Sequence, residues 1–476
     1  MLKKLFSHTA IYGLAPQITK IASFFSLPLI TQELTDIDYG VAGVLGAYTA
    51  AISVLATLGL NMILVNTYFK NPNWYTWVWR QLYGFLALWN IFYAIILAVL
   101  IYFVVPEEAK DNRWTILLLN IGPLVFFGQT SIIGALYYQL KQKPIQIAIR
   151  SSVFGVLAVS LNVIFIYFLK MGYMGWFWSA FVVGMLNNLS YFYPLNFVIK
   201  IKPIFNYKWR LVKNSLKISL PLVPHYYSSY LMNSSDKMVM DILNVSTSSV
   251  GKYNIAYTVG NVMNSLAHAS GMAVSPLLMK FFKEKNDLSA KYLIMLMQIS
   301  LLVITFCFSI WMKEIFGFLI KNEEMAKMYY LGIIIVMAVN YRPMYIGLNA
   351  KLMYAEKTQV LWRLTFTAGI INVILNLLLI PVFGFEVAAI TTFIGYFFMG
   401  YAGYYFKTFK EISTVNYNVL PWMILTILIS LIAYFSVEIN LYYKVVISFI
   451  AILFSVIALY MINKILIKNQ ITNSSV

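Results

Sequence analysis

The stretch that decides the fold is residues 150–172, RSSVFGVLAVSLNVIFIYFLKMG, which recurs as RLTFTAGIINVILNLLLIPVFG at residues 363–384. Each copy begins with an arginine, places Leu-Asn about a dozen residues later, continues in aliphatic residues and ends with a glycine. The copies start 213 residues apart, which leaves room for six membrane-spanning helices between equivalent positions. Because six is an even number, both copies begin on the same side of the membrane, so the two halves should be related by an axis along the membrane normal.

The composition is that of a membrane protein along nearly the whole chain. Of the 476 residues, 61% are hydrophobic and 11% are charged, and the mean hydropathy is +0.75. Soluble proteins carry roughly 25% charged residues. The single cysteine, Cys307, excludes an intrachain disulfide, and one cysteine with three histidines offers no cluster of metal-site spacing. The sequence therefore predicts an all-α polytopic membrane protein with no metal centre or other cofactor.

Apolar segments of about 20 residues predict membrane-spanning helices. The loops between these segments are short, and none is long enough to form a soluble domain. Fourteen spans are predicted: 8–32, 41–66, 82–105, 114–137, 146–169, 174–199, 214–243, 250–279, 290–312, 327–350, 359–382, 386–406, 418–437 and 442–463.

The distribution of charged residues orients these helices. If both termini are cytoplasmic, the inner side holds 24 basic residues against four acidic ones, and the outer side holds nine basic and thirteen acidic residues. The positive-inside rule predicts this asymmetry, and one missed helix would have exchanged the sides of every later loop. The formal net charge of +18 is therefore explained by a cytoplasmic basic rim that attracts anionic lipid headgroups, and nucleic acid is not an expected partner.

The repeat divides the chain into three parts. They are an N-terminal lobe at 1–205, a C-terminal lobe at 206–411, and two additional helices with a cytoplasmic tail at 412–476. The basic stretch KIKPIFNYKWRLVKNSLK at 200–217 links the lobes, and we expect it to lie in the membrane interface as an amphipathic segment.

The first predicted helix of each lobe is interrupted by prolines, Pro16 and Pro28 in one and Pro221 and Pro224 in the other. Interrupted helices at matching positions of two repeats are the best sequence indication of a transporter's binding site. The alternative is that these prolines are structural, because neighbouring helices in a membrane satisfy the carbonyls that a proline leaves without a partner.

Four stretches, taken in order, are similar to a known family. They are LTDIDYGVAGVLGAYTAAISVLATLGLN at 34–61, LNVIFIYFLKMGYMGWFWSAF at 161–181, SDKMVMDILNVSTSSVGKYNIAY at 235–257 and LNLLLIPVFGFEVAAITT at 375–392. With these stretches and fourteen predicted spans, the chain resembles the bacterial polysaccharide-unit flippases (O-antigen or capsule, Wzx-type) of the multidrug/oligosaccharidyl-lipid/polysaccharide (MOP) superfamily. The resemblance extends over essentially the whole chain.

This resemblance implies two six-helix lobes around a central cavity, and transport by alternating access. It implies a transporter rather than an enzyme, located in the bacterial cytoplasmic membrane. The implied cargo is a polyprenyl-pyrophosphate-linked oligosaccharide that moves from the cytoplasmic to the outer leaflet. The expected partners are this cargo, membrane lipids and the polysaccharide polymerase machinery, and we expect a functional monomer. Coupling to a proton or to Na+ is left open.

Two bases lie deep in predicted spans. Arg342 is nine residues from Lys351, which puts it about 13 Å from the inner rim, farther than an arginine side chain can snorkel. A charge at that depth should face protein or a wet cavity, and a guanidinium fork suits phosphate or carboxylate oxygens. The alternative is a structural arginine that binds carbonyls left without partners by Pro343. Lys20, near mid-membrane in the first helix, could supply a second cationic contact to a pyrophosphate, or be a snorkelled or helix-paired lysine.

Asp236 and Lys237 stand side by side about 10 Å below the outer end of their predicted helix. Adjacent helical residues point about 100° apart, so these two cannot pair face to face. Either each has its own partner, or one of them faces the central cavity. Because they lie inside a stretch that resembles the flippase family, we expect a role in cargo contact, in a gate or in a contact between the lobes. The alternative is an outer-rim pair at the headgroup level.

His225 and His268 lie in the predicted spans at 214–243 and 250–279 and are further candidates for the central cavity. Histidine is the side chain that could carry a coupling proton near neutral pH, whereas buried histidines are more often hydrogen-bonded core residues. Asparagines within spans either line the cavity or form hydrogen bonds between helices, and the second interpretation is favoured. These asparagines are Asn61, Asn261, Asn264 and Asn340.

Three other functions compete with this interpretation. A drug or metabolite exporter of the same superfamily usually has twelve spans and often a carboxylate in its first helix, where this chain has Lys20. A lipid II flippase usually shows several arginines in its first helices, which this chain lacks. A membrane glycosyltransferase or polymerase could use the acids of ELTDIDYG at 33–40, but such enzymes generally need a long outer loop or a soluble domain.

Overall fold

The computed structural model describes the backbone of residues 2–474, and within that range it contains helices and no strand. The all-α fold class is thereby confirmed for this part of the chain. Side chains are described over the same range except at residues 2–16, 222, 225, 229, 358, 463 and 465–474.

The chain forms two compact units. Unit 1 consists of Met1–Tyr230 together with Ser246–Gly251, and unit 2 consists of Leu231–Val245 together with Lys252–Val476. The chain therefore enters unit 2, returns to unit 1 for one short segment and then completes unit 2. The division into lobes that the repeat predicts remains a prediction.

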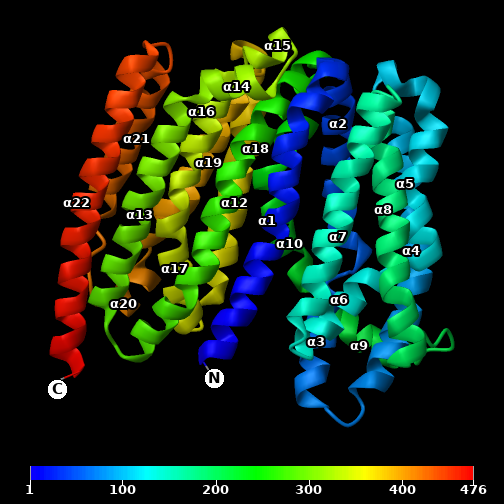
Figure 1. The fold of residues 1–476 in the computed structure, drawn as a ribbon. Helices are drawn as coiled ribbons and strands as arrows, with labels where there is room; N and C mark the ends of the chain where they lie inside the picture. Colours follow the sequence, from blue (N-terminus) through cyan, green and yellow to red (C-terminus); the bar gives the residue numbers. More distant parts are fainter. Residues whose placement is uncertain (1, 475–476) are drawn as a thin grey trace. The chain divides into compact units, whose positions relative to one another are not determined.

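The longer helices of unit 1 pack side by side (Figure 1). Its elements are α1 (Leu2–Glu33), α2 (Asp36–Ser53), η1 (Val54–Ala56), α3 (Leu60–Lys70), α4 (Tyr75–Val104), η2 (Glu107–Asn112), α5 (Arg113–Phe127), α6 (Thr130–Leu140), α7 (Pro144–Asn162), η3 (Val163–Phe168), α8 (Met174–Tyr193), η4 (Pro194–Val198), α9 (Trp209–Ser219), η5 (Leu220–Leu222) and most of α10 (Val223–Asn233). Helix α1 packs along α7, and α5 contacts both α4 and α8. Their facing aliphatic and aromatic side chains form the apolar core of this unit.

Glycines end two helices of unit 1 where the chain bends. Gly59 has φ 71° and separates η1 from α3, whereas Gly128 has φ 53° and separates α5 from α6. Glycine adopts these conformations without the steric strain that a Cβ would cause. Helices α5 and α6 are bent by 52° relative to each other, so the predicted span at 114–137 is a broken one.

The first turn of α12 (Thr247–Lys283) packs against the start of α2 within unit 1. Two glycines allow this close approach of the backbones. A Cβ added to Gly251 would lie 1.7 Å from the carbonyl oxygen of Asp36, and one added to Gly40 would lie 1.9 Å from the carbonyl oxygen of Thr247. Any side chain at either position would therefore displace α12 from α2.

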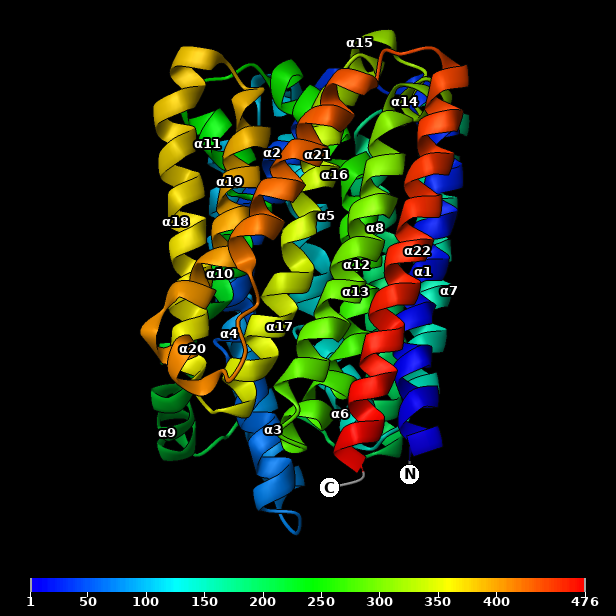
Figure 2. The same ribbon diagram turned by 90° about the vertical axis from the view of Figure 1, so that its left-hand side faces the viewer.

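Unit 2 is a second bundle, in which α13 lies against several other helices (Figure 2). Its elements are the end of α10, α11 (Ser235–Ile242), α12 from residue 252, α13 (Asp287–Ile310), α14 (Met312–Leu319), α15 (Glu323–Ala326), α16 (Tyr329–Ala338), η6 (Val339–Tyr341), α17 (Arg342–Tyr354), α18 (Thr358–Phe383), α19 (Val387–Tyr401), η7 (Ala402–Tyr405), α20 (Lys407–Ile412), α21 (Val419–Ser436) and α22 (Leu441–Ser474). Helix α13 contacts α16, α17, α21 and α22, and α18 pairs with α19. The core at one end of the bundle is built from Ile294, Leu348 and Phe397 with their neighbours.

Nine helices or runs of helices among the described residues are long and apolar enough to cross a membrane, or ten if the bent pair α5 and α6 is one span. These ten coincide with ten of the predicted spans. The other four, at 8–32, 174–199, 214–243 and 250–279, are also helical and are not among these ten. The chain is therefore a multi-pass membrane protein, whereas the count of fourteen and the cytoplasmic position of both termini remain predictions.

The predicted interruption of the first helix is wrong, because α1 continues as one helix through Pro16 and Pro28. Membrane helices tolerate proline where neighbouring groups satisfy the backbone. The predicted span at 214–243 is instead broken several times, since α9, η5, α10 and α11 follow one another and the last break falls at Ser234. The first helices of the two predicted lobes are therefore not a matching pair of interrupted helices.

Candidate functional site

Asp236 in α11 is a buried carboxylate that accepts four hydrogen bonds from neutral side chains; we call this group the Asp236 cluster. Its Oδ2 accepts from the hydroxyls of Tyr253 (2.7 Å) and Thr392 (2.8 Å), and its Oδ1 accepts from the amides of Asn372 (3.0 Å) and Asn376 (2.8 Å). The residue is only 1% exposed. Four donors on two oxygens suit an ionised carboxylate, which can only accept, and they offset part of the cost of burying its charge.

The Asp236 cluster joins α11, α12, α18 and α19. The two asparagines of α18 are themselves linked, because Asn376 Nδ2 donates to Asn372 Oδ1 at 2.8 Å, and Thr391 of α19 donates to Asn376 Oδ1. Asn376 is the asparagine of the Leu-Asn pair in the second repeat copy. In unit 1 the corresponding Asn162 also accepts a hydrogen bond from the next helix, donated by Ser179. The Leu-Asn pair therefore bonds adjacent helices in both copies, and only the second copy surrounds a carboxylate.

Lys237 lies beside a polar pocket of about 440 Å³. The ammonium is 5.1 Å from the centroid of the Tyr257 ring, and no carboxylate lies within 4.0 Å of it among the described residues. Asp236 and Lys237 therefore do not pair with each other: Asp236 is bonded within its cluster, and Lys237 borders the pocket. The pocket is lined by Asn233, Ser234, Lys237, Asn254, Tyr257, Thr258, Asn261 and Asn264.

One face of α12 carries a polar residue at every turn; we call it the polar face of α12. It consists of Asn254, Thr258, Asn261, Ser265 and His268, spaced four, three, four and three residues apart. Three of them are exposed and two are half-buried, and the row extends over about 21 Å at 1.5 Å per residue. In hydrocarbon, such side chains would lose their hydrogen bonds to water. The polar face of α12 therefore suits a water-filled space rather than lipid.

Arg342 opens α17, directly after the turn η6, and is half-buried. Its guanidinium carbon is 5.8 Å from the Tyr341 ring centroid, and its buried Nε has no hydrogen-bond partner among the described residues. Within the same part of the chain no carboxylate lies within 4.0 Å of it. Pro343 lies in the first turn of α17, where a proline costs the helix no hydrogen bond. The alternative of an arginine that serves carbonyls left by Pro343 is therefore disfavoured.

The remaining predicted site residues are spread over both units. Lys20 is an exposed residue of α1 in unit 1, and no carboxylate lies within 4.0 Å of it among the side chains described. His268 is exposed on the polar face of α12 in unit 2. His225 lies in the helical backbone of α10, and its side chain falls outside the described residues.

Three of the four asparagines named within spans divide into two groups. Asn340 bonds helices together, because its Nδ2 donates to Thr305 (2.8 Å) and its carbonyl accepts from Gln298 (3.0 Å). Asn261 and Asn264 instead line the pocket beside Lys237, where Asn264 donates to Asn261 at 3.1 Å. The favoured interpretation as bonds between helices therefore holds for Asn340 and not for the two asparagines of α12.

Several residues of this site escaped the sequence analysis. Three of the four partners of Asp236 lie on α18 and α19, 136 to 156 residues away in the chain, and no local pattern links them to it. The polar face of α12 did leave a signal, since Asn254, Thr258 and Asn261 recur at helical spacing in a segment that is otherwise apolar. No group of three or more His, Cys, Asp and Glu side chains suited to a metal ion occurs among the described residues.

Solved structures with this fold are membrane transporters. The structure "Lipid II flippase MurJ, inward closed conformation" matches with a TM-score of 0.59 and 16% identity, over 90% of this chain and 99% of that one. An outward-facing multidrug resistance MATE family transporter of the MOP superfamily matches with a TM-score of 0.55 and 14% identity, over 91% and 96%. A eukaryotic MATE transporter matches with a TM-score of 0.56 and 12% identity, over 91% and 99%.

The fold that this chain shares with those structures, together with its candidate membrane spans, defines a multi-pass membrane protein. Residues 5–282 match the model of the family described as polysaccharide biosynthesis protein, and the chain belongs to that family. The predicted resemblance is thereby confirmed. No curated protein matches the chain in sequence.

Proposed function

We propose that this protein is a flippase for a polyprenyl-pyrophosphate-linked oligosaccharide repeat unit. It moves the repeat unit from the cytoplasmic to the outer leaflet of a bacterial cytoplasmic membrane by alternating access, for the biosynthesis of O-antigen, capsule or exopolysaccharide. Membership in a polysaccharide biosynthesis family supports the cargo class, and a fold shared with flippases supports a transporter rather than an enzyme. The observation that carries the proposal is the polar face of α12 beside Lys237.

The chemistry of these surfaces matches the two parts of such a cargo. Amide and hydroxyl groups on the polar face of α12 can exchange hydrogen bonds with sugar hydroxyls, and the Tyr257 ring offers an apolar face to a sugar ring. Lys237 and Arg342 supply cationic donors for the pyrophosphate oxygens. Neither of them forms an ion pair with a carboxylate among the described residues, so both charges remain available to an anion.

A drug exporter is the second candidate, because several solved relatives of this fold are multidrug transporters. A cationic drug would require acidic or aromatic surfaces. Here none of the described residues that line the pocket is acidic, the neighbouring Asp236 is buried within its four donors, and the charged residue of the lining is Lys237. This arrangement favours an anionic cargo.

The coupling ion of the proposed cycle is a proton or Na+ held at the Asp236 cluster. An ionised carboxylate with only neutral partners is the group that gains most from taking up either cation. The chemistry of the surroundings fits both ions, since hard cations bind carboxylate, hydroxyl and amide oxygens, and an asparagine amide presents its oxygen after a half-turn. A bound Na+ would supply positive charge to Asp236 and hold α11 to α18 and α19. Thermal unfolding of wild-type protein and Asp236→Asn in NaCl and in choline chloride tests this assignment independently of transport, since only the wild type should be stabilised by Na+.

The first experiment is a lipid extraction from cells that lack the gene, followed by mass spectrometry of polyprenyl-linked sugars. Accumulated complete repeat units with loss of surface polysaccharide are the expected result. Incomplete repeat units would point to an enzyme, and an unchanged lipid pool with intact surface glycan would favour the exporter.

A matched pair of variants tests whether the polar face of α12 contacts the cargo. Asn261→Ala removes an amide from that face, whereas Leu266→Ala shortens an exposed apolar residue of the same helix. Complementation of the deletion strain should fall with Asn261→Ala and persist with Leu266→Ala. Equal complementation by both variants at equal membrane levels would remove the polar face of α12 from the proposal.

A functional monomer and the polymerase as a partner also belong to this proposal, and they are tested by crosslinking in membranes.

A further inference from the structure

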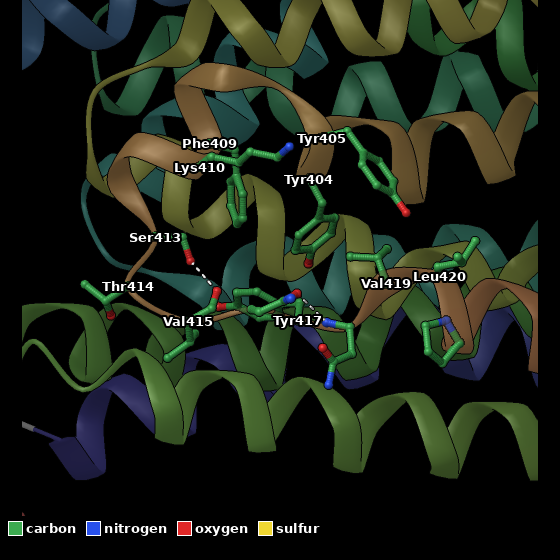
Figure 3. Close-up of a pocket in the computed structure, with 13 residues that line it drawn as sticks. Tyr404, Tyr405, Phe409, Lys410, Ser413, Thr414, Val415, Tyr417, Val419 and Leu420 are labelled. Atoms are coloured by element: carbon green, nitrogen blue, oxygen red, sulfur yellow. Dashed lines mark hydrogen bonds between the residues drawn. The ribbon is translucent and has the colours of Figure 1, made fainter.

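A second pocket lies in unit 2 beside the segment 406–418, which connects α19 and η7 to α21 (Figure 3). It has a volume of about 620 Å³, which is in the size range of small-molecule sites. The pocket lies where two candidate spans, Val387–Tyr405 and Val419–Ser436, leave the apolar region. The predicted orientation puts this connection on the cytoplasmic side, at the level of the lipid headgroups.

Three buried aromatic rings form the floor of this pocket. Tyr404 lies 4.8 Å from Phe409 and 5.1 Å from Tyr417 between ring centroids, and Phe409 lies 6.0 Å from Tyr417. Figure 3 shows the three rings together below Lys410. The Tyr404 hydroxyl donates to the Met344 carbonyl at 2.7 Å, which fixes its ring. The Tyr417 hydroxyl is buried and has no hydrogen-bond partner among the described residues, so one donor of the floor remains unsatisfied.

The wall of the pocket is held in place by a buried ion pair. Asp287 Oδ1 accepts from Lys351 Nζ at 2.6 Å, and Asp287 Oδ2 accepts from both the amide (3.0 Å) and the hydroxyl (2.7 Å) of Thr414. Thr414 lines the pocket, so the connecting segment is attached directly to α13 and, through Asp287, to Lys351 of α17. Further along, Asn416 Oδ1 accepts from the Asn418 amide at 2.9 Å. The pocket is therefore preformed rather than the outline of a loose loop.

The mouth of the pocket combines one cation with apolar groups. Lys410 is exposed, its ammonium lies 5.9 Å from the Tyr405 ring centroid, and no carboxylate lies within 4.0 Å of it in the described part of the chain. Its neighbour Lys407 is engaged by Glu411 at 3.9 Å. Tyr405 and Leu420, at the ends of the two spans, are about half exposed and apolar. A ligand that satisfies this lining carries a single phosphate on a polar headgroup and has hydrocarbon attached to it.

We propose that this pocket binds the headgroup of an anionic glycerophospholipid of the cytoplasmic leaflet. The phosphate contacts Lys410, the glycerol lies over the aromatic floor beside Asn416, and the acyl chains leave past Tyr405 and Leu420. Lysine side chains at the membrane surface attract anionic lipid, and a phosphate oxygen accepts charge-assisted hydrogen bonds from an ammonium. Through Thr414 the bound lipid also holds the inner ends of α13 and α17. This inference does not depend on the identity of the transported cargo.

The test uses the full-length protein, purified in detergent and titrated with phosphatidylglycerol or phosphatidylcholine while bound lipid is counted by native mass spectrometry. One molecule of phosphatidylglycerol should bind the protein more tightly than any further phosphatidylglycerol molecules do. Phosphatidylcholine should not displace that first molecule. Lys410→Gln should weaken that first site about fivefold, the effect expected of one surface lysine. Lys407→Gln, three residues away, is the matched control and should bind like the wild type.

Two further arms decide the source of the phosphate. Leu420→Asn keeps the cation and removes an apolar group from the mouth, so it should weaken phosphatidylglycerol while leaving any binding of sn-glycerol 3-phosphate unchanged. Equal loss with Lys407→Gln and Lys410→Gln would show a diffuse charge effect and overturn the site. Competition by sn-glycerol 3-phosphate as strong as that by the lipid would assign the pocket to a soluble phosphate ester and likewise overturn the proposal.

Discussion

Unit 2 buries two aspartates in opposite ways. Asp236 is surrounded by four neutral donors, two hydroxyls and two amides, whereas Asp287 accepts from the ammonium of Lys351 and from Thr414. Both carboxylates are nearly inaccessible, at 1% and 4% exposure. A carboxylate with neutral donors can change its charge without leaving an opposite charge unpaired. A carboxylate in an ion pair cannot, because its loss leaves a buried cation.

This contrast distinguishes Asp236, whose charge can change within the folded protein, from Asp287, whose charge is needed to stabilise the fold. The Asp236 cluster lies next to Lys237, which lines the pocket together with residues of the polar face of α12. On the proposed function, a change of charge at Asp236 would therefore alter the electrostatic interaction of the pocket with a bound cargo. The Asp287–Lys351 pair joins α13 to α17 and attaches the connection that follows α20. The same substitution at the two aspartates should therefore have different consequences.

Asp287→Asn should have the largest effect on stability. It leaves the Lys351 ammonium, which is 8% exposed, without a carboxylate partner, and breaking a buried ion pair costs about 3–5 kcal/mol. The measurement is thermal unfolding in detergent, followed by the loss of monodisperse protein. The double variant Asp287→Asn with Lys351→Met removes both charges and should recover most of the loss. A double variant no more stable than the single one would contradict the ion-pair account.

Asp236→Asn should destabilise the protein less, by about 2 kcal/mol, because the amide keeps one acceptor and the four donors lose only part of their hydrogen bonding. Asp236→Asn should nevertheless impair function more than Asp287→Asn does. The variant should fail to complement the deletion strain although its level in the membrane is normal. If Asp236→Asn were as unstable as Asp287→Asn, the Asp236 cluster would be a structural element and not a switchable one.

Thr414→Val should cost about 1 kcal/mol, since it removes the hydroxyl donor to Asp287 and keeps the main-chain amide donor. Ser413→Ala is its control, because among the described residues the Ser413 hydroxyl bonds only to the carbonyl of Val415, at 2.9 Å. Measured side by side, the unfolding temperature of Thr414→Val should be lower than that of Ser413→Ala. Equal temperatures would mean that Thr414 does not anchor the connection to α21.

Lys237→Gln should have the smallest effect on stability of these substitutions, since the half-buried ammonium has no ion-pair partner to lose among the described residues. Binding of a pyrophosphate-bearing lipid should nevertheless weaken about tenfold, the effect of one charged hydrogen bond of roughly 1.4 kcal/mol. Microscale thermophoresis with undecaprenyl pyrophosphate measures this change. Lys327→Gln, a lysine paired with Glu324 at 2.7 Å, is the control that should leave binding unchanged.

The two aspartates also show how far sequence reasoning reaches. Most spans could be predicted, because about 20 apolar residues are a strong and local signal. Arg342 could be singled out for the same reason, since a charge stands out in an apolar segment. The donors to Asp236 on α18 and α19 lie 136, 140 and 156 residues away, and only the folded chain brings them together.

Counting the charged residues of each loop predicts the orientation of the helices, but it does not predict which charged residues form ion pairs. Lys351 and Asp287 count among the inner-rim charges in the sequence, and both are buried against each other in the structure. Lys444 and Glu314 behave in the same way at 2.6 Å, where the lysine is fully buried. Only the three-dimensional neighbourhood distinguishes a solvated lysine from one that holds two helices together.

On the proposed function, the polar face of α12 bears on how the cargo specificity of this protein can change. Thr258, Asn261 and His268 are exposed, and substitutions at exposed helix positions usually change stability by less than about 0.5 kcal/mol. On the proposed function, mutations there would alter which sugars are accepted while the Asp236 cluster and the Asp287–Lys351 pair stay intact. A lineage that acquires a new surface glycan could then change the specificity of its transporter by a few substitutions on one helix face that cost little stability. Selection by antibodies or phages that recognise the glycan would therefore act, through the cargo, on that face more than on the rest of the chain.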